Sequence, residues 1–589
     1  MKHVILLLFL GFGALQAQTA IHLYADSAHA PFYWGVASGD PSDSSVIIWT
    51  KSTSANVVVW QVSSDSAFSA ITQTGNIFPD SSHDFTIQLK VNSLAPDTRY
   101  YFRFIDYLGR YSMRGRTHTM PRGPVSKVGL AVFSCSSVYS GYFNAYRAAS
   151  TYDSLLAFVH LGDFIYDFID PQERVRIPAS APVNPTNLNA WRDIYKMYYL
   201  DPDLRKARAE FPFIQIWDNH DVTNNSSRSA AVQAFREYVP VDWPPQTDTF
   251  RIYRKKNIGN LADIFMIDDW LYKTDTFSDG STNMLGSRQE AWLFTGLNNS
   301  TATWKIMGVS KTMCGWYTKG FDPFVLALVP NDGDVFNGEA WDGFPTSRYR
   351  LLNHIRTQRI QNIMTLSGDM HYSLKAELSE TPTDTNTYDR RTGNGSVGVE
   401  FAPTSVSRGN FDESGLPPSL VNTTLPNLNL KTNPHQLWQE YTSHGFGILW
   451  LYPDSSVAEW HATPILSIDS SDELLHRDVV LKDQNRWYRP GIETGTDVKP
   501  AIVNHTWKVY PNPSEDMIIL ENSAFSDEKV RLCFYQMNGA RIRETFEAQT
   551  LQGKVQISLN GLPFGDLLLR ISGSGVEQSI QIVHSKSTR

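Results

Sequence analysis

Four short segments of the chain place side chains able to bind a metal ion at or just after the ends of apolar runs. They are FSCSS (133–137), GDFIYD (162–167), WDNHDVTNN (217–225) and SGDMHYS (367–373). Together they offer a thiolate, two carboxylates, a phenolate, an amide oxygen and an imidazole, on Cys135, Asp163, Asp369, Tyr166, Asn219 and His371. His220 stands beside Asn219 and is available for another role. This mixed set of ligand types indicates a metal centre.

The residue types indicate a centre with two ions. The carboxylate of Asp163 can bridge two cations, and Tyr166, three residues on, can turn back to one of them. Phenolate and thiolate ligands favour a strongly Lewis-acidic ion such as ferric iron, because both deprotonate easily next to high charge. The second position is expected to see the oxygens of Asp163, Asn219 and Asp369, which suit calcium, magnesium or manganese. Two ions roughly 3.5–4 Å apart could clamp a phosphate ester and activate a water nucleophile.

Each of these residues has a plainer interpretation when taken alone. A Gly-Asp pair after a strand is usually a turn, a lone Cys135 is more often a small buried apolar residue, and a lone His220 could be a hydrogen-bonded core residue. The prediction of a dinuclear site therefore rests on the combination of four segments, in order, each at a strand end.

Between Val125 and about Ile468 the chain reads as an α/β domain. Nearly continuous apolar runs predict strands buried on both faces, and helix-like segments lie between them. The runs include KVGLAVFSC, SLLAFVHLGD, FPFIQIWDNHD, LADIFMIDD, TWKIMGVS and NIMTLSGDMH, and the helix-like segments include LNAWRDIYKMYYL and RSAAVQAFREYV. In such folds ligands gather at the carboxyl ends of the strands, where the candidate metal ligands stand.

A different pattern precedes this region. The runs SSVIIWT, NVVVWQV, HDFTIQLKV and TRYYFRFID alternate apolar and polar residues between turn signals, which predicts an antiparallel β-sandwich over 30–122. The stretch LAPDTRYYFRF resembles the corner of immunoglobulin-like or fibronectin-like domains in which a tyrosine ties a strand to a turn. We expect a packing module here, followed by the α/β domain over 125–487.

The two ends of the chain carry further signals. Residues 1–17 read as a cleaved secretory signal peptide, with Lys2 before an apolar run and small residues near Ala17. An uncleaved membrane anchor is the alternative, but the apolar run is short for a membrane span. The polar stretch 488–504 is predicted to be a linker. A small β module is expected over 505–589, with Asn538-Gly539 as a hairpin turn.

Length, charge and cysteine content narrow the class of protein. A chain of 589 residues is too long for one core, so several domains are expected. A net charge of -8 argues against a nucleic-acid-binding surface. No segment after the signal peptide has about 18 uninterrupted apolar residues, so no transmembrane span is expected in the mature chain. Three scattered cysteines, Cys135, Cys314 and Cys533, do not form a disulfide framework.

The motifs resemble those of a known family. GDFIY, DNHD and GDMH together are similar to the metallophosphoesterase superfamily, and more closely to the alkaline phosphatase D (PhoD-type) family. The similar segments are WGVASGDPSDSSVIIWT (34–50), Cys135, GDFIYD, the stretch 191–225, WDGFPTSRYRLL (341–352), SGDMHYS and HGFGILWLYPD (444–454). The chain departs from the family in having Asn219 and Asp221 within DNHD, and Asp268-Asp269-Trp270 where the family often shows Asp-x-Arg.

The resemblance implies a four-layer α/β/β/α catalytic domain with Fe3+ and Ca2+, preceded by an immunoglobulin-like domain. Mn, Mg or Zn are further options at the second position. Carried over to this chain, Cys135, Asp163, Tyr166 and His371 would hold the iron. Asp163, Asn219 and Asp369 would hold the second ion, with Asn225 as an additional or substitute ligand. His220 would be the general acid, or would stabilise the transition state, at the leaving oxygen.

The resemblance therefore implies a secreted or cell-surface phosphoesterase that hydrolyses phosphate monoesters, diesters or both with a metal-activated water. Two alternatives stay open: a phosphodiesterase or phospholipase-like enzyme on phospholipids or cell-wall phosphopolymers, and an inactive surface adhesion protein. The C-terminal module resembles the sorting domain of proteins exported by type IX secretion, which would make that machinery a partner. An ordinary β-sandwich binding module is the alternative for this segment.

Overall fold

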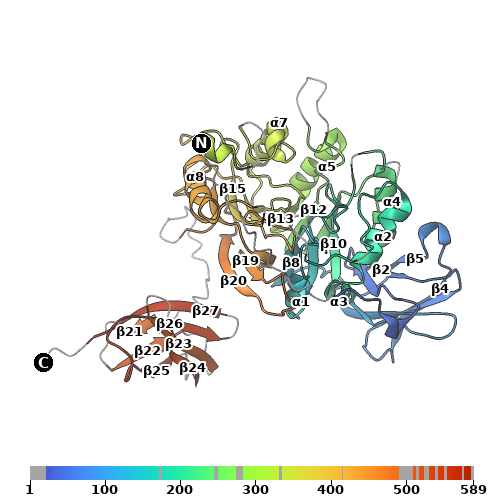
Figure 1. Ribbon diagram of the computed structural model, residues 1–589, viewed down its shortest axis with the longest axis horizontal. Helices are drawn as coiled ribbons and strands as arrows, with labels where there is room; N and C mark the ends of the chain where they lie inside the picture. Colours follow the sequence, from blue (N-terminus) through green and yellow to red (C-terminus); the bar gives the residue numbers. More distant parts are fainter. Residues whose placement is uncertain are drawn as a thin grey trace, which may run out of the picture. The chain divides into compact units, whose positions relative to one another are not determined.

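The structure, a computed structural model, divides the chain into two compact units, residues 1–492 and 493–589 (Figure 1). It describes residues 22–170, 175–178, 180–223, 225–244, 250–273, 283–329, 334–413, 415–489, 508–511, 516–522, 529–536, 541–549, 554–573 and 576–585. The predicted signal peptide, nearly all of the predicted linker and the Asn538-Gly539 turn lie outside these residues.

The first large sheet, called sheet 1 below, lies in the first unit and has nine strands. Its strand order is β20-β19-β18-β8-β9-β10-β1-β2-β5. The strands β8, β9, β10 and β1 are parallel neighbours. Their bounds in that order are Glu473–Leu481, Ser455–Thr463, His444–Leu451, Val128–Phe133, Leu155–His160, Pro212–Gln215, Val36–Gly39, Val46–Lys51 and Thr86–Val91. The apolar runs predicted as buried strands at β8, β9 and β10 are confirmed.

The second large sheet, sheet 2, has the strand order β11-β12-β13-β14-β16-β15-β17. Strands β12, β13, β14 and β16 are parallel neighbours. The bounds in sheet order are Arg254–Ile258, Ala262–Met266, Trp304–Gly308, Ile363–Leu366, Gly398–Ala402, Ser373–Leu378 and Gln436–Glu440. The runs LADIFMIDD, TWKIMGVS and NIMTLSGDMH are therefore strands, as predicted.

Alternate residues along these strands pack into different cores, which shows how the layers are arranged. In β12, Ile264 and Met266 belong to the core shared with sheet 1, whereas Phe265 packs into a second core with helices α5 and α7. This alternation is the period of two that a strand imposes on its side chains. Helices α1 to α4 pack into the first core. The predicted α/β class is confirmed. The bounds of α1 to α5 and α7 are Asn144–Ala149, Leu188–Tyr198, Pro202–Glu210, Arg228–Tyr238, Gly286–Asn299 and Pro345–Thr357, while α6 and α8 span Pro323–Leu326 and Leu425–Thr432.

The N-terminal β region shares a sheet with the α/β region. Strands β4, β3, β6 and β7 form a separate antiparallel sheet, whereas β1, β2 and β5 continue sheet 1 through the parallel pairing of β1 with β10. The hydroxyl of Tyr100 accepts a hydrogen bond of 2.9 Å from the amide of Ala95, so the expected tyrosine corner is present. The bounds of the separate sheet are Ile71–Ile77, Val58–Ser63, Arg99–Ile105 and Gly115–His118.

The second unit is built from β-strands around its own apolar core. One sheet has the order β21-β22-β25 and the other β24-β23-β26-β27, which agrees with the predicted β module. The bounds in these orders are Lys508–Tyr510, Met517–Glu521, Lys554–Ser558, Arg541–Gln549, Lys529–Gln536, Gly565–Gly573 and Val576–His584. Within the described residues, no helix is long and apolar enough to cross a membrane. Cys135, Cys314 and Cys533 are buried, and none of the three is part of a disulfide in the structure.

A buried ion pair joins the two large sheets. Asp40, just after β1, accepts hydrogen bonds of 2.5 and 2.6 Å from the guanidinium of Arg254 at the start of β11. Burial alone would raise the pKa of Asp40, but Arg254 and Lys256 hold it below its ordinary value. Because both side chains are buried, removing one partner would leave an uncompensated charge in the core.

We therefore expect Arg254→Ala to lower the free energy of unfolding by about 3–5 kcal/mol. Lys90→Ala serves as the control, because it breaks a half-exposed pair with Asp242 and should cost less than about 1 kcal/mol. Urea unfolding followed by tryptophan fluorescence measures both variants. Equal losses of unfolding free energy in the two variants would show that the buried Arg254–Asp40 pair stabilises the fold no more than the half-exposed pair does.

Candidate metal centre

The candidate ligands stand directly beyond the carboxyl ends of parallel strands. Cys135 follows β8, Asp163 follows β9, and Asp369 and His371 follow β14. These four residues have φ angles between 52° and 71°, a left-handed conformation that is costly for residues other than glycine. Non-glycine residues in this conformation cluster at functional sites, because the surrounding structure must hold them there.

Four of the predicted ligands converge on one point. Ligand atoms of Cys135, Asp163 and His371 all lie within 4.8 Å of one another. The Tyr166 hydroxyl is 3.0 Å from Oδ2 of Asp163 and 3.2 Å from Nε2 of His371. The Sγ of Cys135 lies 3.8 Å from the same Asp163 oxygen. The structure thus brings together the set predicted to hold iron.

Cys135, Asp163 and Tyr166 are buried and His371 is partly buried, and hydrogen bonds hold these side chains in fixed orientations. The Nδ1 of His371 lies 3.0 Å from the carbonyl oxygen of Gly409, so Nδ1–H donates to that oxygen and Nε2 faces the other ligands. Burial lowers the pKa of His371 well below its ordinary value, which keeps the imidazole neutral and able to bind a metal ion. Burial, with the charge of Asp163, raises the pKa values of Cys135 and Tyr166.

Buried polar groups position the loops that carry the ligands. The carboxylate of Asp221 accepts hydrogen bonds from the backbone amides of Phe164, Ile165 and Asp218, and so ties the loop after β9 to the loop after β10. At Gly162 the φ angle is 105°, and a Cβ there would lie 2.7 Å from the Cβ of Asp218. Glycine is therefore required for the two loops to approach so closely.

The residues expected at the second metal position meet a lysine instead. The ammonium nitrogen of Lys311 lies 2.8 Å from Oδ1 of Asn219, 2.5 Å from Oδ1 of Asp369 and 3.0 Å from Oδ2 of Asp218. The other oxygen of Asp369 accepts a hydrogen bond from the side-chain amide of Asn337. Asp163 does reach toward the loop of Asn219, because its Oδ1 accepts the amide of His220 at 3.2 Å.

The residues present fit a metal ion at the first position but not at the second. Thiol, carboxyl, phenol and imidazole groups from three loops converge on one point, and their chemistry suits a Lewis-acidic ion. At the second position, the oxygens of Asn219 and Asp369 already hold the Lys311 ammonium. The side chain of the exposed Asn225 accepts hydrogen bonds from Ser227 at the start of α4. Nothing in this geometry supports Asn225 as a ligand, and its role stays a prediction.

His220 lies beside this cluster and is oriented by a carboxylate. Its Nδ1 is 2.8 Å from Oδ1 of Asp167, and its ring stacks on Tyr166 with centroids 4.4 Å apart. Phe168 packs against the same ring. With Nδ1 held by Asp167, Nε2 is the nitrogen left to exchange a proton with a substrate. A partly exposed histidine held in this way has the geometry of a general acid.

Comparisons with known proteins decide the family. Residues 130–460 match the family described as PhoD-like phosphatase, and residues 16–121 match its N-terminal domain. This chain belongs to the PhoD-like phosphatase family. It is 28% identical over 487 residues to alkaline phosphatase D of Bacillus subtilis (strain 168), covering 74% of this chain and 78% of that protein. A solved structure titled "Structure of PhoD" aligns with a TM-score of 0.67 and 26% identity, covering 79% of this chain and 93% of the other.

Membership of the PhoD-like phosphatase family establishes the reaction class. The chain is a phosphoric ester hydrolase, as the motifs predicted, and the family assignment gives no support to an inactive adhesion protein. Residues 508–584 match the family described as secretion system C-terminal sorting domain. The predicted assignment of the C-terminal module is confirmed by this match.

Three residues of this PhoD-like site were not singled out from the sequence. Asp167 is the last residue of the GDFIYD motif and directly follows Tyr166, so its place in the motif could have marked it as a site residue. Lys311 follows the strand run TWKIMGVS as the other site residues follow theirs. Arg408 lies far along the chain, with its guanidinium carbon 5.5 Å from the centre of the Tyr166 ring and an ion pair of 3.0 Å to Asp170. No local motif marks Arg408, so only the fold reveals it.

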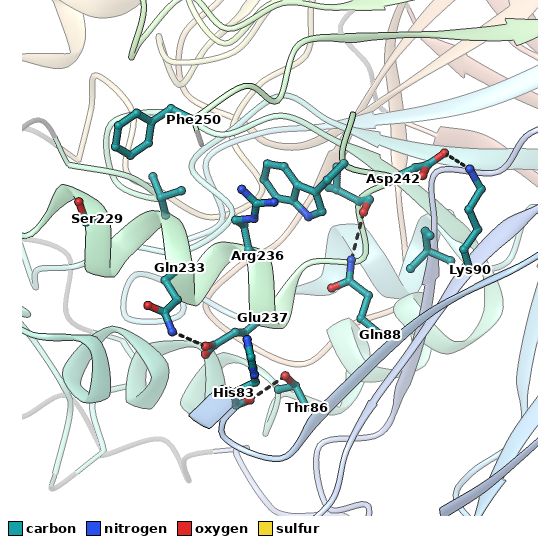
Figure 2. A pocket seen from close by; sticks show the side chains of 14 residues that line it. His83, Thr86, Gln88, Lys90, Ser229, Gln233, Arg236, Glu237, Asp242 and Phe250 are labelled. Atoms are coloured by element: carbon teal, nitrogen blue, oxygen red, sulfur yellow. Dashed lines mark hydrogen bonds and ion pairs between the residues drawn. The ribbon is translucent and has the colours of Figure 1, made fainter. Parts of the chain in front are cut away.

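The larger of two cavities does not coincide with the metal ligands of this PhoD-like phosphatase. The cavity at the ligand cluster has a volume of about 230 Å³ and is lined by Asp369, His371, Phe336 and Phe411 among others. A larger cavity of about 890 Å³ lies between α4 and β5 (Figure 2). Polar side chains of its lining pair with one another or with backbone, as Lys90 with Asp242, Gln233 with Glu237, and Gln88 with the carbonyl of Val241 do. This larger cavity lies at the contact between the N-terminal β region and α4, and none of the candidate metal ligands lines it.

The Asp167–His220 pair can be tested by a conservative substitution. Asp167→Asn keeps the size of the side chain but removes its charge, which weakens the hydrogen bond to His220. We therefore expect phosphatase turnover to fall by about 10–100-fold. The matched control is Asp80→Asn, which changes an exposed aspartate 3.4 Å from His83. Steady-state assays on an aryl phosphate should show no loss for the control. Unchanged kcat in Asp167→Asn would show that Asp167 does not orient His220 for catalysis.

Proposed function

We propose that this protein is a secreted, metal-dependent phosphoesterase whose resident ion is held by Cys135, Asp163, Tyr166 and His371. The observation that supports the proposal best is the approach of the thiol, carboxyl and imidazole ligand atoms to within 4.8 Å, with the phenol hydrogen-bonded among them. Two ligands that deprotonate easily beside a high charge favour ferric iron at this position. When bound, the ion supplies Lewis acidity for the phosphoryl oxygen and a lowered pKa for a water ligand.

The residues around the cluster provide the remaining chemistry. His220, oriented by Asp167, gives a proton to the oxygen of the leaving alcohol. The guanidinium of Arg408, next to Tyr166 and Phe168, adds positive charge beside a site that must attract a phosphate. Asp163 holds both the ligand cluster and the His220 amide, so it fixes the distance between the ion and the proton donor.

A phosphodiesterase or phospholipase-like activity is the second candidate, and the lining of the site cavity favours it. Phe336, Met370 and Phe411 form an apolar wall beside Asp369 and His371, and the rings of Phe336 and Phe411 lie 5.7 Å apart. Such a wall would accommodate the second, apolar substituent of a diester better than the open charge of a monoester.

Parallel assays on mono- and bis-aryl phosphates distinguish these two candidates. A monoesterase should show the higher kcat/KM on the mono-aryl substrate, and a diesterase on the bis-aryl substrate. Turnover of neither substrate, by a protein shown to contain its metal ion, would contradict both.

We also propose that the C-terminal module directs export through the type IX machinery, which places the enzyme outside the cell or on its surface. The match to a sorting domain supports this. In a host with that machinery, the full chain should reach the medium or cell surface, whereas a chain ending at residue 492 should stay in the periplasm. Equal export of both chains would contradict this role.

A further inference from the structure

The oxygens predicted to bind a second metal ion surround the side chain of Lys311. This lysine is 2% exposed, and its ammonium group carries three N–H donors and no acceptor. The three short contacts go to Asn219, Asp369 and Asp218, so each donor has one oxygen. The ammonium group therefore occupies the place of a bound cation. It is buried between two carboxylates and an amide oxygen, and all three of its N–H donors are used.

A metal ion and this ammonium cannot share the position. Calcium bound by Asn219 and Asp369 would lie about 2.3–2.6 Å from their oxygens. The Lys311 nitrogen is 2.8 and 2.5 Å from the same two atoms. An ion there would meet a positive charge in contact with its own ligands, at a buried position where repulsion between like charges is strong.

The side chain of Asp269 fixes the backbone segment that carries Lys311. The carboxylate of Asp269 accepts hydrogen bonds from the amides of Ser310 and Lys311, from the hydroxyl of Ser310, and from the indole of Trp341. The ring of Trp270 lies 5.5 Å from the ammonium nitrogen. Asp269 and Trp270 belong to the segment Asp268-Asp269-Trp270, where the family often shows Asp-x-Arg, so residues of this departure from the family also position Lys311.

We propose that Lys311 supplies the second positive charge of this phosphatase, so that the enzyme binds one metal ion per chain instead of two. The inference rests on the proposed metal centre at Cys135, Asp163, Tyr166 and His371.

Metal content measured by mass spectrometry, after dialysis against excess calcium, tests the proposal. The wild-type chain should hold one ion, of a transition metal, and no stoichiometric calcium. Lys311→Ala frees the three oxygens and should bind one additional divalent ion, bringing the total to two. The matched control is Lys256→Ala, which removes another buried lysine that donates to the carbonyl of Asp40, and its content should stay at one.

The outcomes separate this inference from the proposed function. A wild-type chain with one transition-metal ion and one calcium ion would overturn the role of Lys311 and leave the first metal centre intact. A wild-type chain without any stoichiometric ion would overturn the metal centre itself, and the inference with it. A Lys311→Ala chain that still binds one ion in excess calcium would show that these oxygens are not a cation position. The wild-type measurement decides the matter even where the variant does not fold.

Discussion

Replacing Asp163 with alanine should reduce turnover of an aryl phosphate by about 10³-fold or more, because this one side chain holds several parts of the site together. Its Oδ2 meets the Tyr166 hydroxyl and the Cys135 thiol, and its Oδ1 accepts the His220 amide. The loss should appear in kcat/KM and should be accompanied by loss of the bound ion.

The control for this prediction is Asp80→Ala, an aspartate exposed at the surface, far from the ligand cluster in the sequence. It should keep full activity and metal content. Circular dichroism should show the same secondary structure for both variants. If Asp163→Ala is folded and retains more than a tenth of the activity, the account of the metal centre is wrong.

Replacing His220 with glutamine should have an effect that depends on the leaving group. A general acid contributes about 10²–10⁴-fold when the departing oxygen needs a proton. We therefore expect a loss of that order in kcat for an alkyl phosphate and a much smaller loss for 4-nitrophenyl phosphate, whose phenolate departs unaided. Bound metal should be unchanged, because no ligand atom of the cluster belongs to the His220 side chain.

His83→Gln provides the matched control for His220, since His83 also lies beside an aspartate but is exposed and remote. It should leave both substrates unaffected. An equal loss on the alkyl and aryl substrates in His220→Gln would show that His220 acts through binding or positioning and not as a proton donor.

The fold and the ligand cluster could be predicted from the sequence for one physical reason. Strands buried on both faces are nearly continuous apolar runs, and the polar residue that ends each run lies at the same edge of a parallel sheet. Cys135, Asp163, Asp369 and His371 all follow such runs, and the strands β8, β9, β13 and β14 form as expected. This rule places Cys135 and Asp163 together at the edge of sheet 1, and Asp369 and His371 at the edge of sheet 2. The two sets meet because both sheets pack around a shared core, which the apolar runs alone do not specify.

Contacts that depend on side-chain direction do not follow from the pattern of apolar runs. Lys311 follows β13 just as the ligands follow their strands, yet its position depends on Asp269, which is 42 residues away in the chain and fixes the Lys311 amide. Asn225 shows the reverse case. It lies in a motif with functional residues, but its side chain accepts hydrogen bonds from Ser227, a local role at the start of α4. Sequence spacing does not distinguish an oxygen used locally from one aimed at a metal ion.

The position of the bound ion can be measured by anomalous X-ray scattering. In crystals of the purified protein, an anomalous difference map collected at the iron absorption edge should show one strong peak within bonding distance of Cys135 Sγ, Asp163 Oδ2, the Tyr166 hydroxyl oxygen and His371 Nε2. No peak among these four atoms in crystals of active enzyme, or a peak elsewhere in the chain, would contradict the account.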